Sequence, residues 1–318
     1  MEDTELLKYN FSDLYINSNK DFYISDERYL NSLRKVTPTD KDKFYKKVVN
    51  TEHQERSYSI KYRGTSFRVE NVVSTNGEIY CLRRMPLQVP SIHNLGFDNR
   101  FVQYMLSLAS YSGLILWAGS TGNGKTTSIS ALLSEYLKLN GGFAYTIEDP
   151  AEMPLEGEYT ALNGSVGLCK QIEVQNDKWG DALKSALRSH PRYILIGEIR
   201  TPDAAHECLR AAISGHLVLS TIHSGSISSA ISSLVKYASY YMSEASAYDI
   251  LSRGLLSIIY QNLDGLETKR KPEIEALFAN PEVNQACQVR STIRNGNLNL
   301  ATSIEAQAIR MQQGKKLF

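Results

Sequence analysis

The stretch "LILWAGSTGNGKTTSISALL", residues 114–133, constrains the chain most, because an apolar run breaks here into glycines, a lysine and two threonines. Residues 119–126 fit the pattern G-x-x-x-x-G-K-[ST] at every fixed position. The pattern stands between an expected buried strand and an expected helix. We therefore interpret it as a phosphate-binding loop rather than as a glycine-rich turn that happens to contain a lysine.

Each residue type in this loop suits a nucleotide. Glycines let successive backbone N–H groups point into one concavity, and the following helix adds the positive end of its dipole. Lys125 supplies a charge for the outer phosphates, and the Thr126 hydroxyl is the expected protein ligand of Mg²⁺. No N-K-x-D sequence follows, which favours ATP over GTP. The residues expected to bind the nucleotide are Gly119, Ser120, Thr121, Gly122, Asn123, Gly124, Lys125, Thr126 and Thr127.

Acidic residues follow two further expected strands. "YTIEDP" contains Glu148 and Asp149, and "YILIGEIR" contains Glu198. Ligands of open α/β sheets bind at the carboxyl ends of the strands, and hydrolysis needs one carboxylate to orient water and another near the metal. We therefore interpret these acids as site residues rather than as surface charges that begin loops.

Two histidines flank the strand "LVLSTI". His223 stands at its carboxyl end, on the expected nucleotide side, and His216 stands at the opposite end. Either one alone is more typical of a structural histidine. Metal binding is not expected, because neither has a second ligand at helical or hairpin spacing.

Changes of pattern divide the chain. Helical spacing in "DERYLNSLRKV" and "DKFYKKVVN" precedes β-rich segments that include a hairpin signal at Asn76–Gly77. A proline-containing stretch near residues 85–97 is typical of a linker. We predict an α+β domain with its linker over residues 1–95 and a second domain over residues 96–318.

The second domain is predicted to be α/β. A helix capped by Asp98 is followed by short apolar runs that alternate with amphipathic helices, which indicates a mostly parallel sheet covered on both faces. From residue 226 onward we expect mainly helix, with one apolar interruption at "EIEALFA".

Composition bounds the class of protein. With 42% hydrophobic residues, 318 residues can form two globular cores, and no apolar run is long enough to span a membrane. The amino terminus does not resemble a signal peptide. A net charge of +1 disfavours nucleic-acid binding. The four scattered cysteines are expected to be buried, inert thiols in a reducing cytoplasm: Cys81, Cys169, Cys208 and Cys287.

Four ordered stretches resemble the secretion ATPase superfamily, which includes type II secretion, type IV pilus, conjugation and type IV secretion ATPases. "GSTGNGKT" resembles its Walker A loop, "TIEDPAEM" its Asp box, "ILIGEIR" its Walker B with an unusual glycine, and "GHLVLSTIHS" its His box. The resemblance implies a RecA-like P-loop core with a smaller PAS-like domain, and it covers most of residues 60–318.

The resemblance also implies roles. Glu148 would activate or position water, Glu198 would act on Mg²⁺ through its water, and His223 would sense the outer phosphate. "FRVENVV" and "YCLRRMP" resemble strands that carry arginines toward the phosphates, which indicates Arg68 and Arg83, with Arg84 as the alternative to Arg83.

Assembly and location are implied by the same resemblance. It implies a homohexamer that holds ATP between its two domains and moves a partner at the cytoplasmic face of the inner membrane, with no direct nucleic-acid contact. "VRSTIRNGNLNLATSIEAQ" resembles the carboxyl-terminal helices of pilus retraction motors, with Val289, Arg290, Ile293 and Arg294 at the right spacing.

Several departures favour a compact class: retraction motors, or ATPases of type IVB secretion, conjugation and thin pili. Thr201 replaces an acidic residue, with Asp203 slightly later, "SHPR" replaces an acidic–proline–acidic sequence, and the zinc-binding tetracysteine element is absent. Two alternatives are a RecA-like DNA translocase or helicase, and a nucleotide-binding assembly subunit that barely hydrolyses ATP.

Overall fold

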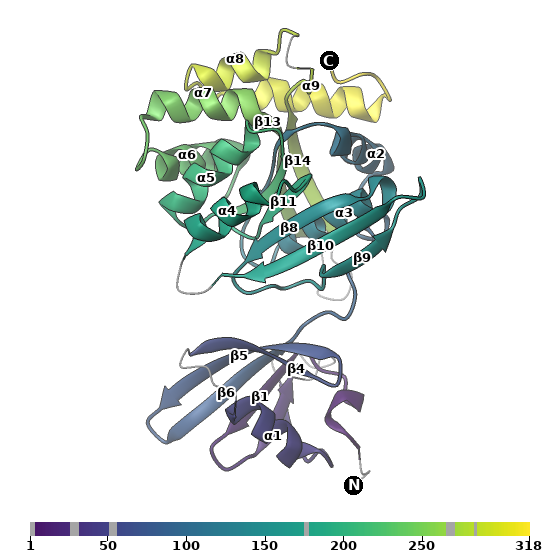
Figure 1. Ribbon diagram of the computed structural model, residues 1–318, viewed down its shortest axis with the longest axis vertical. Coiled ribbons are helices and arrows are strands. Elements are labelled where there is room, and N and C mark those ends of the chain that lie inside the picture. The colour runs from purple at the N-terminus through teal and green to yellow at the C-terminus, as the bar shows by residue number, and fades with distance from the viewer. Residues whose placement is uncertain (1–3, 26–31, 51–55, 175–177, 265–270, 283–284) are drawn as a thin grey trace. The chain divides into compact units, whose positions relative to one another are not determined.

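The chain divides into two compact units in the computed structural model, which describes residues 4–25, 32–50, 56–174, 178–264, 271–282 and 285–318 (Figure 1). The smaller unit comprises residues 1–88 and 152–154, and the larger unit comprises residues 89–151 and 155–318. Each unit has its own hydrophobic core. The two are described separately below.

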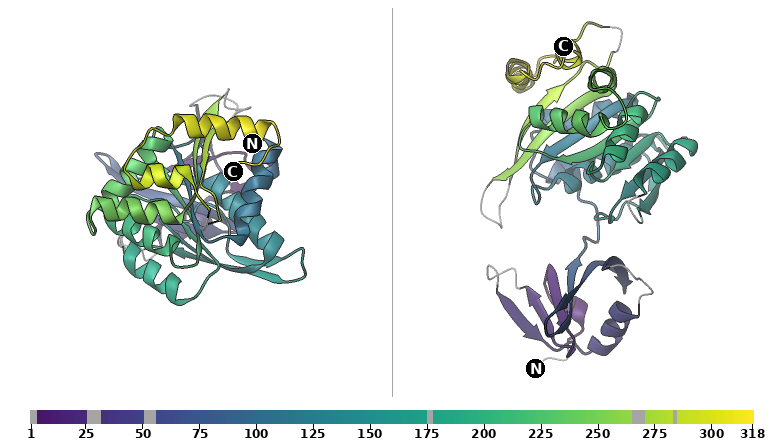
Figure 2. Two further views of the ribbon diagram at one scale, coloured as in Figure 1. Left: turned by 90° about the horizontal axis from the view of Figure 1, so that it is seen from above. Right: turned by 90° about the vertical axis from the view of Figure 1, so that its left-hand side faces the viewer.

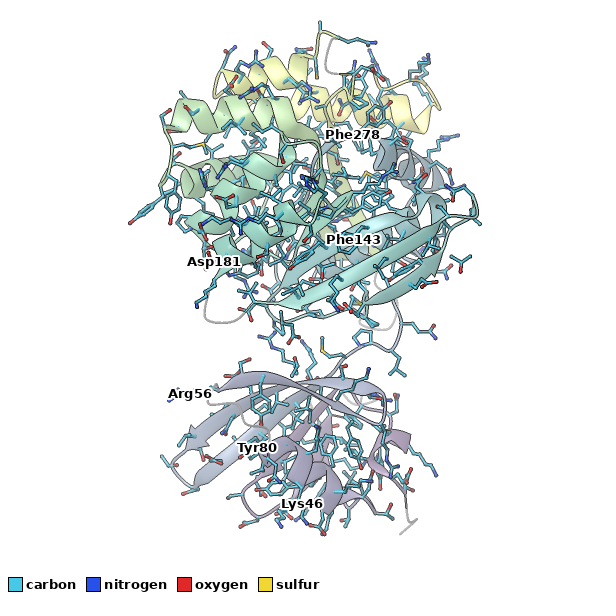
Figure 3. The ribbon with its side chains drawn as sticks, viewed as in Figure 1. Lys46, Arg56, Tyr80, Phe143, Asp181 and Phe278 are labelled. Atoms are coloured by element: carbon cyan, nitrogen blue, oxygen red, sulfur yellow. The ribbon has the colours of Figure 1, made fainter. Side chains whose placement is uncertain are left out.

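The smaller unit is an antiparallel sheet with one α-helix, so it is α+β as predicted. The sheet order is β3-β2-β1-β6-β5-β4. Phe44 and Val48 of the helix are buried in its core, and the ring of Tyr80, labelled in Figure 3, packs edge-on against Tyr45. The elements are a 3₁₀ helix at Leu6–Lys8, β1 (Asp13–Asn17), β2 (Phe22–Ser25), β3 (Leu33–Val36), α1 (Lys41–Val49), β4 (Ser57–Tyr62), β5 (Thr65–Ser74) and β6 (Gly77–Arg84).

Most predictions for this unit are confirmed, and one is wrong. The helix in "DKFYKKVVN" and the hairpin at Asn76–Gly77 are present, with Ser74 opposite Gly77 in the register. The helix predicted in "DERYLNSLRKV" is wrong for Leu33–Val36, which form a strand paired with β2; residues 26–31 lie outside the described residues. Pairing with an existing strand overrides a short helical pattern, because each residue gains a cross-strand partner.

The larger unit contains an eight-stranded sheet of order β14-β13-β7-β12-β11-β8-β10-β9. The six strands β13, β7, β12, β11, β8 and β10 are parallel to one another. The two edge strands are antiparallel: β14 pairs with β13, and β9 pairs with β10. The strands are β7 (Gly113–Gly119), β8 (Gly142–Glu148), β9 (Gly157–Thr160), β10 (Val166–Glu173), β11 (Tyr193–Ile196), β12 (Leu217–His223), β13 (Leu255–Asp264) and β14 (Lys271–Phe278).

Helices cover both faces of this sheet, as Figure 1 and the side view in Figure 2 show. Its α-helices are α2 (Asn99–Ser107), α3 (Lys125–Asn140), α4 (Trp179–Arg188), α5 (Pro202–Ala212), α6 (Ile227–Ala238), α7 (Glu244–Gly254), α8 (Gln288–Arg294) and α9 (Ala301–Gln312), with 3₁₀ turns at Ile92–Asn94 and Leu108–Ser110. As predicted, the Asp98 carboxylate caps α2 by accepting from the N–H groups of Arg100 and Phe101.

Strand β7, which lies inside the sheet between β13 and β12, is apolar at successive positions because both of its faces are covered. Leu114, Leu116 and Ala118 pack in the core with α4 to α7, whereas Ile115 and Trp117 pack in the core with α2 and α3. A parallel strand covered on both faces must be apolar at every position. This is the α/β, RecA-like core that the sequence predicts.

The prediction that residues beyond 226 are mainly helical, with one apolar interruption, is wrong for β13. This strand lies next to the edge strand β14 and pairs on its other side with β7. The predicted interruption at "EIEALFA" coincides largely with β14, which pairs with β13. The run "LLSIIY" of β13 follows α7 without a loop and is nearly continuously apolar, so its period does not separate strand from helix. Strands β9 and β10 were not predicted either.

The carboxyl-terminal helices lie at one end of the larger unit (Figures 1 and 2). Phe278 at the end of β14, labelled in Figure 3, packs edge-on against Tyr104 of α2. Across the described residues, no helix has the length and apolar character that a membrane crossing requires.

Candidate functional site

The predicted site residues of the larger unit meet at one edge of the sheet. Strands β7, β12, β11 and β8 are neighbours and run parallel, so their carboxyl ends lie at the same edge. His223 is opposite Gly119 in the register, and Ile196 is opposite Ile147. The phosphate loop, His223, Glu198 and Glu148 therefore follow one another along this edge.

The phosphate loop has the backbone that a bound phosphate requires. Gly119, Gly122 and Gly124 have φ angles of 151°, 82° and 75°, which residues with side chains rarely adopt. Gly124 is the N-cap of α3, no side chain caps its N–H groups, and its first turn contains no acidic residue. The amino end of α3 is therefore left for an external anion, as the chemistry of a nucleotide phosphate demands.

Lys125 lies folded against its own loop. Its side chain is largely buried, and its Nζ donates to the carbonyl oxygen of Ser120 at 3.0 Å. An ammonium group held above the loop can turn to the outer phosphates of a nucleotide at little cost. Thr126 and Thr127 follow in the first turn of α3 and are half-buried. The Thr126 hydroxyl is thus available to hold Mg²⁺ together with phosphate oxygens.

Glu148 is a buried acid whose position is fixed by an amide. The residue is 1% exposed, and the Nε2 of Gln171 on β10 donates to its Oε1 at 2.8 Å. The Oε1 of Gln171 accepts in turn from the N–H groups of Leu155 and Glu156 at 3.3 and 3.4 Å. Sequence reasoning missed Gln171, because only the pairing of β8 with β10 brings it to Glu148.

Glu198, unlike Glu148, is partly exposed and is paired with an arginine. Its Oε2 accepts from the Nε of Arg200 at 2.6 Å, and both side chains are partly exposed. Thr201, which replaces an acidic residue of the family pattern, is the N-cap of α5, and its hydroxyl accepts from the N–H of Ala204. Thr201 therefore has a structural role as the cap of this helix.

The two histidines of the His box have different surroundings. His223 is the last residue of β12 and is exposed at the site edge. His216 stands before the other end of that strand, and its Nδ1 donates to the carbonyl of Pro191 at 2.6 Å. His216 therefore holds a connecting segment, and of these two histidines only His223 lies at the sheet edge that carries the other predicted site residues.

In the smaller unit, Arg68 and Arg83 are directly opposite each other on β5 and β6, so their side chains share one face of that sheet. Arg83 forms an ion pair with Asp13 at 3.2 Å. Arg84 points to the other face, where its guanidinium lies 5.5 Å from the centre of the Phe11 ring. Arg83 is thus the better partner for Arg68 than Arg84.

The carboxyl-terminal stretch that resembles retraction motors fastens α8 to α7. Val289 and Ile293 are buried in the core. Arg290 is buried as well, and it donates to the carbonyls of Ser252, Arg253 and Asn280.

Comparison with known proteins identifies the family. Residues 53–309 match the family model of type II/IV secretion system proteins. The competence protein ComGA of Halalkalibacterium halodurans is 36% identical over 53% of this chain. A twitching motility protein of Neisseria gonorrhoeae is 30% identical over 72%, and the type IV pilus retraction ATPase PilT of Pseudomonas aeruginosa is 33% identical over 67%. The matches span 47%, 61% and 59% of these relatives' own lengths.

Solved structures give the same result. The crystal structure of the pilus retraction motor PilT with bound ADP matches 98% of this chain and 88% of its own, with a TM-score of 0.73 and 25% identity. The ATPase DotB of Legionella pneumophila shares the fold, with a TM-score of 0.71 at 18% identity. The chain belongs to the family of type II/IV secretion system proteins, as its four ordered motifs predict.

Proposed function

We propose that this chain is an ATP-hydrolysing motor of a type IV pilus or of a secretion or conjugation apparatus. One observation carries the proposal: a P-loop lysine, a buried glutamate and a second glutamate follow three strands whose carboxyl ends share one edge of the sheet. The relatives support the purpose of hydrolysis, because their names concern competence, twitching motility, pili and secretion. They do not favour a DNA translocase.

The residues divide the work by their chemistry. The loop N–H groups and Lys125 bind the phosphates, and Thr126 holds Mg²⁺, which neutralises phosphate charge when it is bound. Glu148 orients the attacking water, and it is suited to this because Gln171 fixes its carboxylate. Glu198 acts on the water shell of the metal after release from Arg200. His223 senses the outer phosphate, and Arg68 and Arg83 supply positive charge during turnover.

The proposal includes an assembly and a location. The chain works as a homohexamer at the cytoplasmic face of the inner membrane, where it acts on platform or secretion-system proteins. It binds no nucleic acid, in keeping with its net charge of +1.

The test compares ATP hydrolysis by the full chain with that of Glu148→Gln, with Glu158→Gln on the exposed part of β9 as the control. Loss of the water-orienting carboxylate is expected to lower kcat by about 10² to 10⁴ while ATP still binds. Pilus formation or secretion is expected to fail in cells that carry only Glu148→Gln. Turnover in Glu148→Gln equal to wild type contradicts the enzymatic role, and normal pili and secretion contradict the motor role.

A further inference from the structure

A buried glutamine on β13 joins three parts of the nucleotide site. Gln261 is 1% exposed, and its Oε1 accepts from the Nε1 of Trp117 on β7 at 2.7 Å and from the Oγ of Ser128 on α3 at 2.9 Å. Its Nε2 donates to the carbonyl oxygen of Asn123 within the phosphate loop at 2.5 Å. One amide therefore connects the strand before the loop, the loop itself and the helix after it.

The three hydrogen bonds hold this amide in one orientation. An indole N–H can only donate and a backbone carbonyl can only accept, so rotating the amide by half a turn would put like groups together at both contacts. The buried amide is therefore held at both its oxygen and its nitrogen.

Gln261 also leaves little room for a side chain at Gly119 and Gly124. A Cβ on Gly119 would lie 2.4 Å from the backbone carbonyl oxygen of Gln261, and a Cβ on Gly124 would lie 3.1 Å from the side-chain Nε2 of Gln261. The glycines of the motif are therefore required by the close approach of β13, in addition to their unusual φ angles.

We propose that Gln261 is a positioning residue that presets the phosphate loop for nucleotide, an inference that rests on the proposed function of that loop. A trans peptide unit is planar, so its C=O and N–H point in opposite directions. Holding the Asn123 carbonyl toward β13 aims the next N–H, that of Gly124, away from β13. This N–H is then fixed for a phosphate oxygen before the nucleotide arrives, and binding needs less ordering of the loop.

The first test replaces the amide by an apolar side chain of similar length. In Gln261→Met, the Kd for ATP and for ADP is expected to rise about tenfold, the equivalent of one well-placed hydrogen bond. Because Glu148 and Glu198 follow other strands, kcat at saturating ATP is expected to stay within about threefold, so that KM carries the effect. A Kd equal to that of wild type contradicts the proposal.

The matched control is Gln307→Met. Gln307 is also a buried glutamine bonded to main chain, because its Oε1 accepts from the N–H of Phe278 and its Nε2 donates to the carbonyl of Phe278. Its loss is expected to lower the Tm while the Kd for nucleotide stays unchanged. An equal rise of Kd in both variants, measured well below their Tm values, means that Gln261 is only structural.

Two smaller substitutions on α3 test the same proposal if Gln261→Met does not fold. Ser128→Ala removes one of the two donors that orient the amide, and Ser130→Ala removes a buried hydroxyl that has no hydrogen-bond partner among the residues that the structure describes. We expect the Kd to rise about threefold in Ser128→Ala and to stay unchanged in Ser130→Ala. Equal Kd values in the two variants overturn the proposal.

Failure of the two proposals can be told apart. If wild type and Gln307→Met bind ATP but Gln261→Met binds it equally well, only the positioning role is wrong. If wild type itself binds no ATP or ADP, the proposed function fails and the positioning role fails with it.

Discussion

Gly197 lies directly against Glu148. A Cβ added to Gly197 would come within 3.1 Å of the Glu148 Cγ and 3.3 Å of its Cα, closer than side chains normally pack. The N–H of Gly197 donates to the carbonyl of Ile147, and the Thr221 hydroxyl donates to the carbonyl of Gly197, so this segment cannot easily move aside. The glycine in the Walker B sequence thus makes room for the acid on the neighbouring strand.

Gly197→Ala is expected to reduce turnover without preventing nucleotide binding. The added methyl group displaces Glu148 by a few tenths of an ångström, and a catalytic group that is misplaced on this scale costs up to about 10² in kcat. The Kd for ATP is expected to change little, because the phosphate loop is untouched. Steady-state hydrolysis and ATP titration of the same preparation measure both quantities.

Gly225→Ala is the matched control, because a Cβ at that glycine would meet nothing within 4 Å. We expect its kcat to equal that of wild type. Equal kcat values for Gly197→Ala and wild type would show that the close approach to Glu148 has no catalytic consequence.

Gln171 is expected to affect hydrolysis mainly through its hydrogen bond to Glu148. Gln171→Met removes the amide that donates to Glu148 Oε1 and so weakens the orientation of the carboxylate; kcat is expected to fall about tenfold with the Kd for ATP unchanged. Gln171→Glu places a second carboxylate against the first and is expected to lower kcat further. Hydrolysis rates that are the same in both variants as in wild type would contradict the positioning of Glu148 by Gln171.

The four cysteines are expected to differ in their reactivity with alkylating reagents. Burial raises the pKa of the Cys208 thiol to about 12, and burial together with the Glu148 carboxylate raises that of Cys169 to about 12. The expectation that all four thiols are buried is wrong, because Cys81 and Cys287 are partly exposed. Burial and Glu70 raise the pKa of Cys81, so it should react slowly.

Iodoacetamide labelling followed by mass spectrometry tests this order. At about pH 8 in the native state, Cys287 is expected to be alkylated first, Cys81 later, and Cys169 and Cys208 only after unfolding, because thiolate is the reactive form. The raised pKa values of Cys81, Cys169 and Cys208 mean that these three thiols keep their protons to higher pH in the folded state than in the unfolded state, so the free energy of unfolding falls as pH rises above about 9. Rapid native alkylation of Cys208 would contradict its burial.

Arg290 is expected to stabilise the fold far more than Arg294. Burial lowers the pKa of the Arg290 guanidinium. Arg290 nevertheless donates to two carbonyls at the end of α7, where a positive charge is favourable, and to the carbonyl of Asn280. Arg290→Met leaves these carbonyls unpaired and should lower the free energy of unfolding by about 2 to 4 kcal/mol.

Arg294→Met is the comparison, because Arg294 pairs with Asp249 at 3.2 Å while about half exposed. Its loss should cost about 0.5 kcal/mol. Chemical denaturation of the two variants gives both values. Equal losses would contradict the structural role of Arg290.

The sequence names the candidate site residues but not the residues that support them. Lys125 is named by the phosphate-loop pattern, Glu148 and Glu198 by their positions after strands, and His223 by the family resemblance. Gln171 and Gln261 cannot be named in this way, because their partners are fixed by strand pairing; Trp117 and Gln261 are 144 residues apart in the chain.

The two errors in the secondary structure predicted from the sequence have a similar origin. The sequence of β13 does not reveal a strand because both faces of β13 are covered, which removes the alternation that marks a strand. The sequence of Leu33–Val36 does not reveal a strand because four residues carry too little pattern and the strand depends on pairing with β2.

Titration calorimetry with ATP and Mg²⁺ on the full chain tests the central claim most directly, with Lys125→Ala measured beside it. The account predicts that wild type binds one ATP per chain and that Lys125→Ala loses most of this affinity. ATP binding that is absent from wild type, or equally tight in Lys125→Ala, would contradict the assignment of residues 119–127 as the nucleotide site.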